Sequence, residues 1–413
     1  MTTPSRRSLL LLLALAGLAG QNALAAGALP ASESPPLRNE VDRAIAPLMQ
    51  RFAIPGMAVA VSVGGQRHYY TYGIASRETR QAVTRNTLFE IGSISKTFTA
   101  TLATYAEVTG KLALSQSPSD FFPELKGSHF DDVTLLNLGT HTSGGLPLQA
   151  PDGIADEQAL LAYFNDWQPL HKPGTRRAYS NPSIGLLGMA AAKSLGGDFE
   201  ELTTRLVMAP LGLTHTYYHV PASEMARYAT GYTSAESPAR VNPGVIDAQA
   251  YGVKSDAVDM LRWAEAVMRS GKSATPLGRA LAQTRTAHYR FGPMTQDLIW
   301  EQYPDPVTDE ALAEGNGSDM VLKPVRAEAI SPPLAADDQV LVNKTGSTNG
   351  FSAYVAFVPA RDIAIVILSN KNHPNVPRVA AAHQILKALD SASNGKRCLL
   401  YTSDAADDTP CVD

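Results

Sequence analysis

The hydrophobic pattern at the start of the chain predicts a helix followed by a β-hairpin. Between Glu40 and Phe52, apolar residues recur at the three- and four-residue spacing of one helix face. Residues 57–63 and 68–72 are strand-like, and Gly64-Gly65 between them is typical of a two-residue hairpin turn. Residues 27–37, which precede this helix, are rich in Pro, Ser and Ala, and they predict no regular element.

The same kinds of element close the chain in the reverse order. Residues 339–344, 351–358 and 363–368 predict three strands separated by short turns, and residues 378–389 predict a helix. Short turns favour antiparallel neighbours. The simplest arrangement therefore pairs the strands of both ends in one antiparallel sheet, with the first and last helices packed on one face.

The middle of the chain predicts a different kind of structure. Residues 94–271 are mostly helical in pattern, whereas residues 303–338 are rich in Pro and Asp and predict a long surface excursion near the sheet. Loops of that length often bind ligands. The fold class is thus α/β plus all-α, with an α/β sheet domain formed by residues 27–93 and 272–392 and a mainly helical region inserted between them.

Length and charge limit the classes of partner. The 413 residues are 44% hydrophobic, which is enough for a globular, enzyme-sized protein with large cores. A formal net charge of −4 favours neither a polyanion-binding surface nor a polybasic membrane patch. We therefore expect no nucleic-acid partner and no stable membrane association, and we expect a monomer.

The first residues resemble an export signal. Arg6 and Arg7 form a positive start, residues 9–19 an apolar run, and Ala23-Leu24-Ala25 a cleavage site, so residues 1–25 predict a signal peptide. The alternative, a membrane anchor, is disfavoured because the apolar run is too short to span a bilayer. The two arginines also resemble a twin-arginine signal, which leaves the export route open.

The last residues differ in character from the rest of the chain. Cys398 and Cys411 are the two cysteines, and residues 398–408 resemble the translation of a common sequencing-library adapter. We therefore treat residues 398–413 as a non-native tail and exclude them from the fold. The alternative is a natural tail with an opportunistic disulfide.

The sharpest chemical feature is Ser93-Ile94-Ser95-Lys96, where a strand-like run meets a helix. Ile94, Phe98 and Leu102 mark a buried stripe of that helix, so Ser93 and Lys96 lie together on another face, one turn apart. A serine at a helix start is close to backbone NH groups that stabilise an oxyanion. A desolvated lysine has a lowered pKa and can accept the serine proton. Alone, this motif also occurs by chance.

A second motif is Tyr179-Ser180-Asn181, just before a predicted helix. A phenol ionises near pH 10, so Tyr179 can act as a base only if neighbouring cations stabilise the phenolate. Two lysines would supply that charge. Alone, the segment fits an ordinary helix cap with a half-buried tyrosine better.

The third motif is Lys344-Thr345-Gly346-Ser347-Thr348 at the end of a strand. A lysine beside hydroxyl groups suits a substrate carboxylate, and Gly346 removes a side chain where substrate must approach the backbone. The Ser347 NH could join the Ser93 NH in an oxyanion hole. Alone, this is a routine strand-to-turn sequence.

Together and in this order, the three motifs resemble those of the serine β-lactamase and penicillin-binding-protein superfamily, most closely class C β-lactamases of the AmpC cephalosporinase type. Class A enzymes would carry a Ser-Asp-Asn motif, which this chain lacks. Residues 54–60, 142–149, 250–255 and 299–302 also look like class C segments. The resemblance extends from about Val41 to Leu389.

The resemblance implies a β-lactamase/transpeptidase-like fold and a periplasmic enzyme that confers resistance by hydrolysing the β-lactam amide of cephalosporins and penicillins. It implies a Ser93 acyl-enzyme that water releases, with no cofactor. The implied catalytic residues are Ser93, Lys96, Tyr179, Lys344 and Ser347. Gln149 and Asn181 would hold the acyl-side amide, and Tyr251 would flank it. The substrate carboxylate would lie near Thr345, Gly346, Asn372, Asn375 and Arg378.

Two alternative functions stay open at this stage. One is a DD-peptidase or esterase of the same fold, although the chain has no G-x-S-x-G nucleophile motif. Another is a penicillin-binding sensor that is acylated but barely turns over, although such a sensor should carry a membrane segment. His215 and His219 have the spacing of a metal pair, but no acidic partner completes a set, so we expect surface or capping roles and no metal.

Overall fold

A computed structural model describes the backbone of residues 35–400 and the side chains of residues 37–389. The predicted signal peptide and residues 401–413 of the excluded tail lie outside the described residues. Within the described part of the chain, no helix combines the length and apolar character that crossing a membrane requires.

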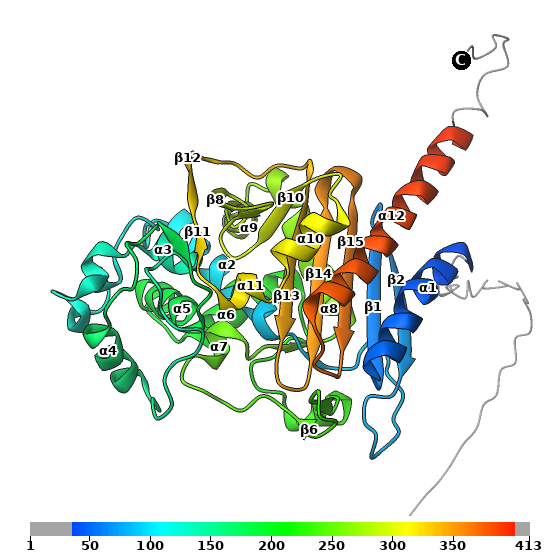
Figure 1. The fold of residues 1–413 in the computed structure, drawn as a ribbon, viewed down its shortest axis with the longest axis horizontal. Coiled ribbons are helices and arrows are strands. Elements are labelled where there is room, and N and C mark those ends of the chain that lie inside the picture. Colours follow the sequence, from blue (N-terminus) through cyan, green and yellow to red (C-terminus); the bar gives the residue numbers. More distant parts are fainter. Residues whose placement is uncertain (1–34, 401–413) are drawn as a thin grey trace, which may run out of the picture. The chain divides into compact units, whose positions relative to one another are not determined.

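An antiparallel sheet of nine strands is the centre of the fold (Figure 1), in the order β12-β8-β9-β10-β13-β14-β15-β1-β2. Strand β1 pairs with both β2 and β15, and Met57 lies opposite Ser369, so the two ends of the chain meet as predicted. Gly64 and Gly65 form the β1–β2 turn with φ angles of 54° and 82°, which suit glycine. The strands predicted from sequence are β1 (Gly56–Val63), β2 (Gln66–Gly73), β13 (Val340–Ser347), β14 (Ser352–Val358) and β15 (Ile363–Ser369).

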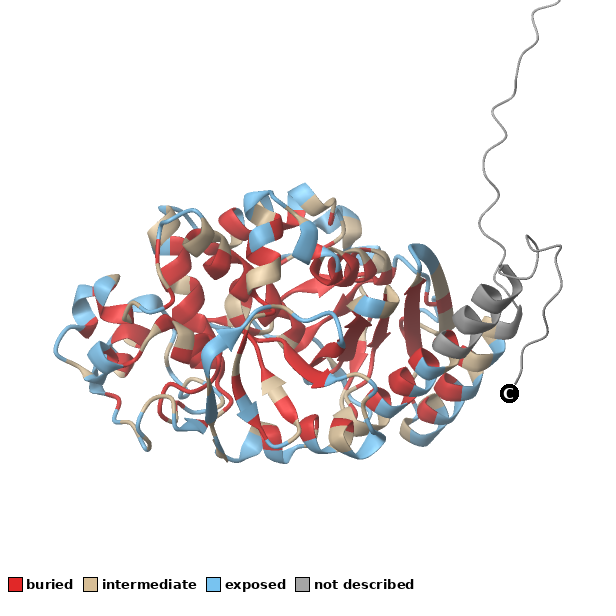
Figure 2. Cartoon of the chain, turned by 90° about the horizontal axis from the view of Figure 1, so that it is seen from above, coloured by how far each residue is buried: buried red, intermediate tan, exposed pale blue. Residues whose placement is uncertain are grey.

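Both faces of this sheet are covered. Helices α1 (Pro35–Phe52) and α12 (Asn375–Leu400) pack on one face, and α8 (Ala257–Met268) packs on the other (Figure 1). Residues alternate between the two cores, because Met57 and Val59 contact the α1–α12 side whereas Ala58 belongs to the opposite core. Strands buried on both faces are expected to be apolar throughout, and Figure 2 shows these strands buried along their length.

The region predicted as a surface excursion, residues 303–338, is more regular than expected. It contains two helices, and its strand β12 adds the outer edge of the sheet. Strand β12 includes Pro332 and Pro333 and is largely exposed. Proline has no backbone NH, so a strand can accommodate it at the edge of a sheet, where one side of the strand has no neighbour to receive a hydrogen bond. The prediction was therefore wrong here. The region follows β8 (Ala287–Phe291) and β9 (Met294–Gln296) and begins within β10 (Glu301–Pro304). Its own elements are α10 (Asp309–Gly315), α11 (Asp319–Leu322), β11 (Val325–Arg326) and β12 (Glu328–Leu334).

The helical region is built around α2 (Ser95–Val108), which packs against α5 (Asn181–Leu195) and α9 (Pro276–Gln283). Helix α1 also begins earlier than expected, because Pro35 to Leu37 are helical. The remaining α-helices and strands are β3 (Phe89–Glu90), α3 (Leu135–Gly139), α4 (Glu157–Asp166), β4 (Arg176–Arg177), α6 (Phe199–Thr203), β5 (Gly231–Tyr232), β6 (Pro238–Ala239), α7 (Asp247–Ala250) and β7 (Lys254–Ser255).

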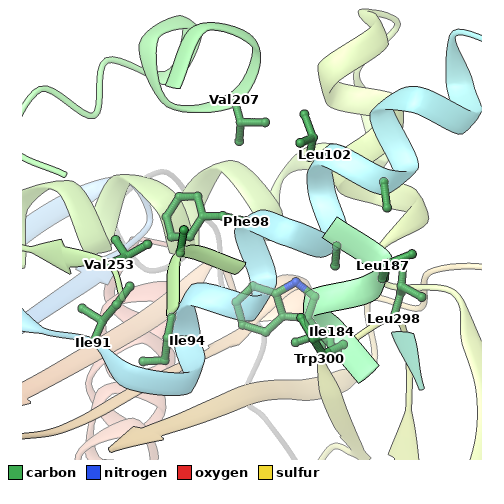
Figure 3. Close-up of a cluster of buried hydrophobic side chains, with 14 of the residues drawn as sticks. Ile91, Ile94, Phe98, Leu102, Ile184, Leu187, Val207, Val253, Leu298 and Trp300 are labelled. Atoms are coloured by element: carbon green, nitrogen blue, oxygen red, sulfur yellow. The ribbon is translucent and has the colours of Figure 1, made fainter. Parts of the chain in front are cut away.

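The predicted apolar stripe of α2 is the part of the core that supports Ser93. Ile94, Phe98 and Leu102 are fully buried, in a cluster that includes Ile184 and Trp300 (Figure 3). This packing fixes the face of α2 that points away from the core. The first turn of α2 therefore has a defined rotation about its axis, which sets the direction of Lys96.

Phe98→Ala is expected to lower the free energy of unfolding by about 3–5 kcal/mol. The Phe98 ring stacks on Trp263 at a centroid distance of 4.2 Å, so its loss leaves a cavity in a closed core. Tyr105→Ala in the same helix is the control, because Tyr105 is only half-buried. Denaturant unfolding measures both, and equal losses would contradict the stated role of Phe98.

Candidate functional site

A cleft of about 1230 Å³ lies between the end of β13, the turn before α2 and the start of α5. All but two of the predicted site residues line it. Lys96 and Arg378 are the exceptions, since both are fully buried behind its wall. The residues that line the cleft are Ser93, Gln149, Tyr179, Asn181, Tyr251, Lys344, Thr345, Gly346, Ser347, Asn372 and Asn375.

The half-buried Ser93 lies in a tight turn between β3 and α2. Gly92 enters this turn with a φ of 52°, and residues 92–94 form one turn of 3-10 helix. The Lys96 Nζ donates to Ser93 Oγ at 2.9 Å and to the carbonyl of Ala250 at 2.8 Å. Burial lowers the pKa of Lys96 to about 8. An amine that contacts the hydroxyl and loses its proton this readily can exchange a proton with it.

Tyr179 lies against the same hydroxyl. The ammonium groups of Lys96 and Lys344 lie 5.1 and 5.4 Å from its ring centroid, and Ser93 also helps to lower the pKa of its phenol. Burial raises the pKa of this phenol, but the charges of Lys344 and then Lys96 outweigh burial and lower it to about 8. The helix start is capped by Ser180, whose side chain accepts from the Ser183 NH at 3.1 Å.

Three further residues complete this site and were missed in the sequence. His141 stacks on Tyr179 at a centroid distance of 4.2 Å, and its Nδ1 accepts from the Ser180 NH at 3.2 Å. Burial, followed by the charge of Arg177, holds the pKa of His141 well below its usual value, so the ring is neutral. Glu301 lies 3.2 Å from Arg177 and 3.5 Å from Lys344. One buried carboxylate therefore partly balances the cations around the phenol.

The end of β13 forms one wall of the cleft. Strand β10 pairs with β13 only as far as Asn343, which leaves the edge of Lys344–Ser347 open toward the turn that holds Ser93. A Cβ on Gly346 would lie 1.9 Å from the carbonyl oxygen of Ile91, and one on Gly92 would lie 2.4 Å from the nitrogen of Ser347. The two backbones are thus in direct contact.

This contact changes the explanation of Gly346. The sequence suggested that glycine clears space for substrate, but the space is filled by the Ile91 carbonyl. The glycine is required because the Ser93 turn must touch β13. As a result, the backbone NH groups of Ser93 and Ser347 come from adjoining segments, as an oxyanion site needs.

Gln149 and Asn181 are paired on the opposite side of the cleft. The Asn181 Nδ2 donates to Gln149 Oε1 at 2.9 Å, and the Asn181 Oδ1 is buried without a hydrogen-bond partner among the described residues. Tyr251 lines the same cleft and is half-buried. This side therefore offers two amide groups and an aromatic ring to a ligand.

Arg378 is placed differently from the expectation. Its guanidinium is fully buried and donates to the Gly346 carbonyl and to Ser347 Oγ, each at 3.0 Å. It therefore supports the end of β13 from behind and does not reach the cleft. Asn372 and Asn375 do line the cleft, and Asn372 Nδ2 donates to the Thr348 carbonyl at 2.5 Å.

Comparison with known proteins agrees with this geometry. A family model described as Beta-lactamase matches residues 41–390. The chain belongs to the β-lactamase family. It is 50% identical over 354 residues to a β-lactamase from Pseudomonas fluorescens, which covers 86% of this chain and 99% of that relative.

Solved structures of β-lactamases specify the class. The chain is similar to a class C β-lactamase in complex with cefoxitin, with 48% identity, a TM-score of 0.82, and coverage of 85% of this chain and 98% of the other. It is also similar to a D-alanine carboxypeptidase AmpC from Burkholderia cenocepacia, with 48% identity, a TM-score of 0.81, and coverage of 85% and 99%. The predicted class C resemblance and the β-lactamase/transpeptidase-like fold are both confirmed.

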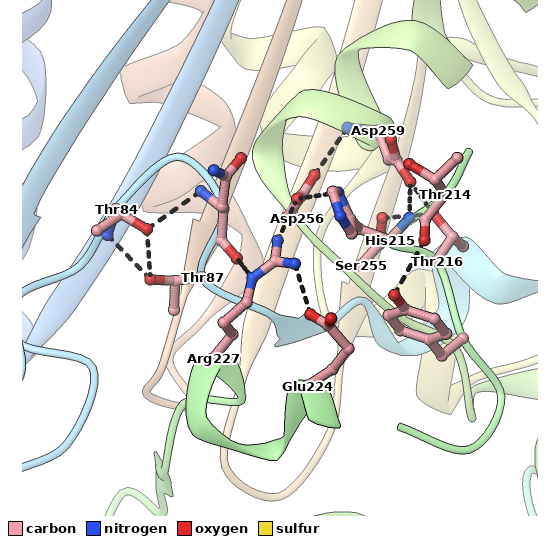
Figure 4. A network of polar contacts seen from close by, with 12 residues as sticks. Thr84, Thr87, Thr214, His215, Thr216, Glu224, Arg227, Ser255, Asp256 and Asp259 are labelled. Carbon is pink, nitrogen blue, oxygen red and sulfur yellow. Dashed lines mark hydrogen bonds and ion pairs between the residues drawn. The ribbon is translucent and has the colours of Figure 1, made fainter. Parts of the chain in front are cut away.

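The His215 region of this β-lactamase is an ion-pair network (Figure 4). The His215 Nδ1 lies 3.3 Å from Asp256, and Asp259 accepts from the His215 NH at 2.6 Å, so the expectation of no acidic partner was wrong. Histidine and two carboxylates within 4.8 Å are potential metal ligands. However, Arg227 lies 3.0 Å from Asp256, and a guanidinium at that position opposes a divalent cation.

The sequence paired His215 with His219, but the structure gives them different partners. The His219 Nε2 lies 3.1 Å from Glu200, whereas His215 belongs to the network at the start of α8. Asp256 caps that helix by accepting from the Asp259 NH at 2.8 Å. The network therefore fixes the helix start.

The phenol of Tyr179 is expected to titrate near pH 8, below an ordinary tyrosine. The charges of Lys344 and Lys96 favour the phenolate, so Tyr179 is protonated below that pH and ionised above it. The difference in tyrosinate absorbance between the wild type and Tyr179→Phe measures this step. Lys344→Met should raise the pKa of Tyr179, because the charge of Lys344 lowers that pKa more than the charge of Lys96 does. A difference spectrum without a step below about pH 9 would contradict the lowered pKa.

Proposed function

We propose that this class C β-lactamase hydrolyses cephalosporins and penicillins through an acyl-enzyme on Ser93, and thereby confers resistance to them. The observation that carries the proposal is the hydrogen bond from the Lys96 amine to the Ser93 hydroxyl at 2.9 Å, beside a Tyr179 ring that lies near both Lys96 and Lys344. A weak nucleophile acquires reactivity when a group that can take its proton is in hydrogen-bond contact.

In the acylation step, Ser93 Oγ attacks the lactam carbonyl while its proton passes to the network of Tyr179 and Lys96. The carbonyl oxygen becomes an oxyanion, which the backbone NH groups of Ser93 and Ser347 stabilise. The carbonyl carbon–nitrogen bond then breaks. The leaving nitrogen takes a proton from the same network, so the network returns to its initial protonation state before the next step.

In the deacylation step, water attacks the Ser93 ester. The network removes a proton from that water, the carbon–oxygen bond to Ser93 breaks, and Ser93 Oγ recovers a proton. Because the phenol and the two lysines interact strongly, their protons belong to the set rather than to one residue. The carboxylate of the buried Glu301, 3.2 Å from Arg177 and 3.5 Å from Lys344, places a negative charge beside these cations.

Substrate groups fit the two sides of the cleft. Gln149 and Asn181 hold the acyl-side amide, and Tyr251 flanks it. Thr345 and Ser347 at the end of β13 hold the carboxylate together with Asn372 and Asn375, which also line the cleft. Arg378 acts on this wall indirectly, by fixing the Gly346 carbonyl and the Ser347 hydroxyl.

We also propose that the protein is exported to the periplasm as a monomer, and that it works without a cofactor or nucleic acid. The support is the signal-like sequence of residues 1–25 and a site composed of side chains that can perform both steps. A periplasmic location suits the task, because the drug is intercepted before it reaches its targets.

Steady-state rates on four substrates test the proposed reaction. We expect kcat/KM on a chromogenic cephalosporin and on benzylpenicillin to exceed that on a D-Ala-D-Ala peptide and on a p-nitrophenyl ester. The peptide is included because one similar structure is a D-alanine carboxypeptidase. Faster peptide cleavage than cephalosporin hydrolysis would overturn the proposal in favour of a peptidase. A persistent stoichiometric acyl adduct would instead indicate a sensor.

A further inference from the structure

Glu90 is a buried carboxylate next to the nucleophile turn that the mechanism does not use. It ends β3, three positions before Ser93, and its relative exposure is 1%. Within the described part of the chain it forms no ion pair. A buried carboxylate without a cation is costly unless several hydrogen bonds stabilise it, so its partners are informative.

Glu90 accepts three hydrogen bonds from three separate segments. Its Oε1 accepts from the Tyr228 hydroxyl at 2.5 Å and from the Val241 NH at 2.7 Å. Its Oε2 accepts from the Thr348 hydroxyl at 2.5 Å. Val241 and Thr348 both line the cleft. One carboxylate thus links two walls of the cleft to the strand that leads into the Ser93 turn.

The bond to Thr348 determines what this hydroxyl can offer to a ligand. A carboxylate can only accept, so the Thr348 hydrogen must point at Glu90. Only the lone pairs of Thr348 Oγ1 are then available to a ligand in the cleft. The Thr348 backbone is held as well, because its carbonyl accepts from Asn372. Thr348 is therefore fixed as an acceptor and does not attract an anionic group.

We propose that Glu90 is a positioning residue that directs the substrate carboxylate away from Thr348 and toward Thr345 and Ser347. This inference rests on the proposed function, since it concerns where the substrate of the same site binds. With a donating hydroxyl at Thr348, the carboxylate would have a competing position further along the β13–β14 turn. Glu90 removes that position because its carboxylate accepts the hydrogen of the Thr348 hydroxyl.

Glu90→Gln tests the proposal with almost no change in shape. The Gln oxygen must stay toward the Val241 NH, which can only donate, so the new NH₂ faces Thr348 and donates to Oγ1. The Thr348 hydrogen is then free to turn toward the cleft. We expect kcat on a cephalosporin with a free carboxylate to fall about tenfold, with KM unchanged or lower, because the substrate still binds but in a less reactive position.

Two comparisons separate positioning from a general structural effect. Esterifying the substrate carboxylate should remove the effect of Glu90→Gln, because no anion is left to misplace. In a Thr348→Val background, Glu90→Gln should change kcat less than about twofold, since the hydroxyl through which it acts is gone. Equal losses on the ester, or additive losses in the double variant, would overturn the proposal.

Glu265→Gln is the matched control. Glu265 is also buried and accepts from a hydroxyl, that of Ser62 at 2.6 Å, but it lies in α8 and does not line the cleft. It should change thermal stability and leave the kcat of both substrates unchanged. A drop in kcat equal to that of Glu90→Gln would show that loss of any buried carboxylate suffices.

A binding experiment keeps this inference separate from the proposed reaction. In a Ser93→Ala background, adding Glu90→Gln should leave the Kd for the free-acid cephalosporin equal or lower and the Kd for the ester unchanged. A weaker affinity for both would contradict the role of Glu90 even if hydrolysis proceeds as proposed. Conversely, failure of the wild type to hydrolyse cephalosporins would refute the reaction, and these binding constants would still decide the role of Glu90.

Discussion

Ser93→Ala is expected to lower cephalosporin turnover by about 10⁴-fold or more. The substitution removes the oxygen that accepts from Lys96, and no other hydroxyl accepts from that amine among the described residues. The fold should be retained, because Ser93 is only half-buried and its side chain contributes little to the core. Binding of substrate should persist, since the cleft walls are unchanged.

Two measurements check this result. Steady-state hydrolysis of a chromogenic cephalosporin gives the rate, and intact-protein mass spectrometry shows whether a covalent adduct forms on the wild type and not on the variant. Ser95→Ala is the control two positions away, where the hydroxyl accepts from the Val253 NH at 3.1 Å. Its loss should reduce stability but retain turnover. Substantial turnover by pure Ser93→Ala would refute the assignment of the nucleophile.

Tyr179→Phe is expected to slow acylation by about 10²- to 10⁴-fold. Phenylalanine preserves the ring that stacks on His141 and lies near both ammonium groups, so the change removes only the hydroxyl. The lost group is the one whose pKa of about 8 allows it to exchange protons near neutral pH. Pre-steady-state kinetics measures the acylation rate, and thermal unfolding shows whether the protein stays folded.

Tyr354→Phe is the control for Tyr179→Phe. Tyr354 is also buried, but it lies in β14 on the sheet face that α12 covers and does not line the cleft. It should leave the acylation rate unchanged. If Tyr179→Phe acylates at a rate within about threefold of the wild type, Lys96 alone serves as the base. Lys96 has a pKa lowered by burial to about 8, so that outcome has a physical basis.

The central fold could be predicted because its strands differ from everything else in the chain. Strands β1, β14 and β15 are almost entirely apolar, with one serine each, and sheets covered on both faces favour that pattern. Strand β12 could not be found in the same way. It is mostly exposed and contains two prolines, so its place at the sheet edge depends on pairing with β8 rather than on its own composition.

The site residues could likewise be predicted only in part. Ser93, Tyr179 and Lys344 occur in motifs, whereas His141 and Arg177 become part of the site only through contacts with Tyr179. Glu301 gave a partial signal, because it lies in one of the class C-like segments. The complete burial of Arg378 was not predicted, since sequence cannot tell whether an arginine points into a cleft or supports its wall.

The pairing of β1 with β15 affects how the chain folds as it is synthesised. Strand β1, the first of the described strands, lies between β2 and β15, so its second edge has no partner until residues 363–369 have been synthesised. Contacts so distant along the chain form slowly. A fragment that stops before β15 would expose that edge, which is a site for aggregation. A fragment that stops before β13 would also hold Ser93 without Lys344. Partial chains should therefore give neither a smaller enzyme nor a stable precursor, and maturation has to await the final strand.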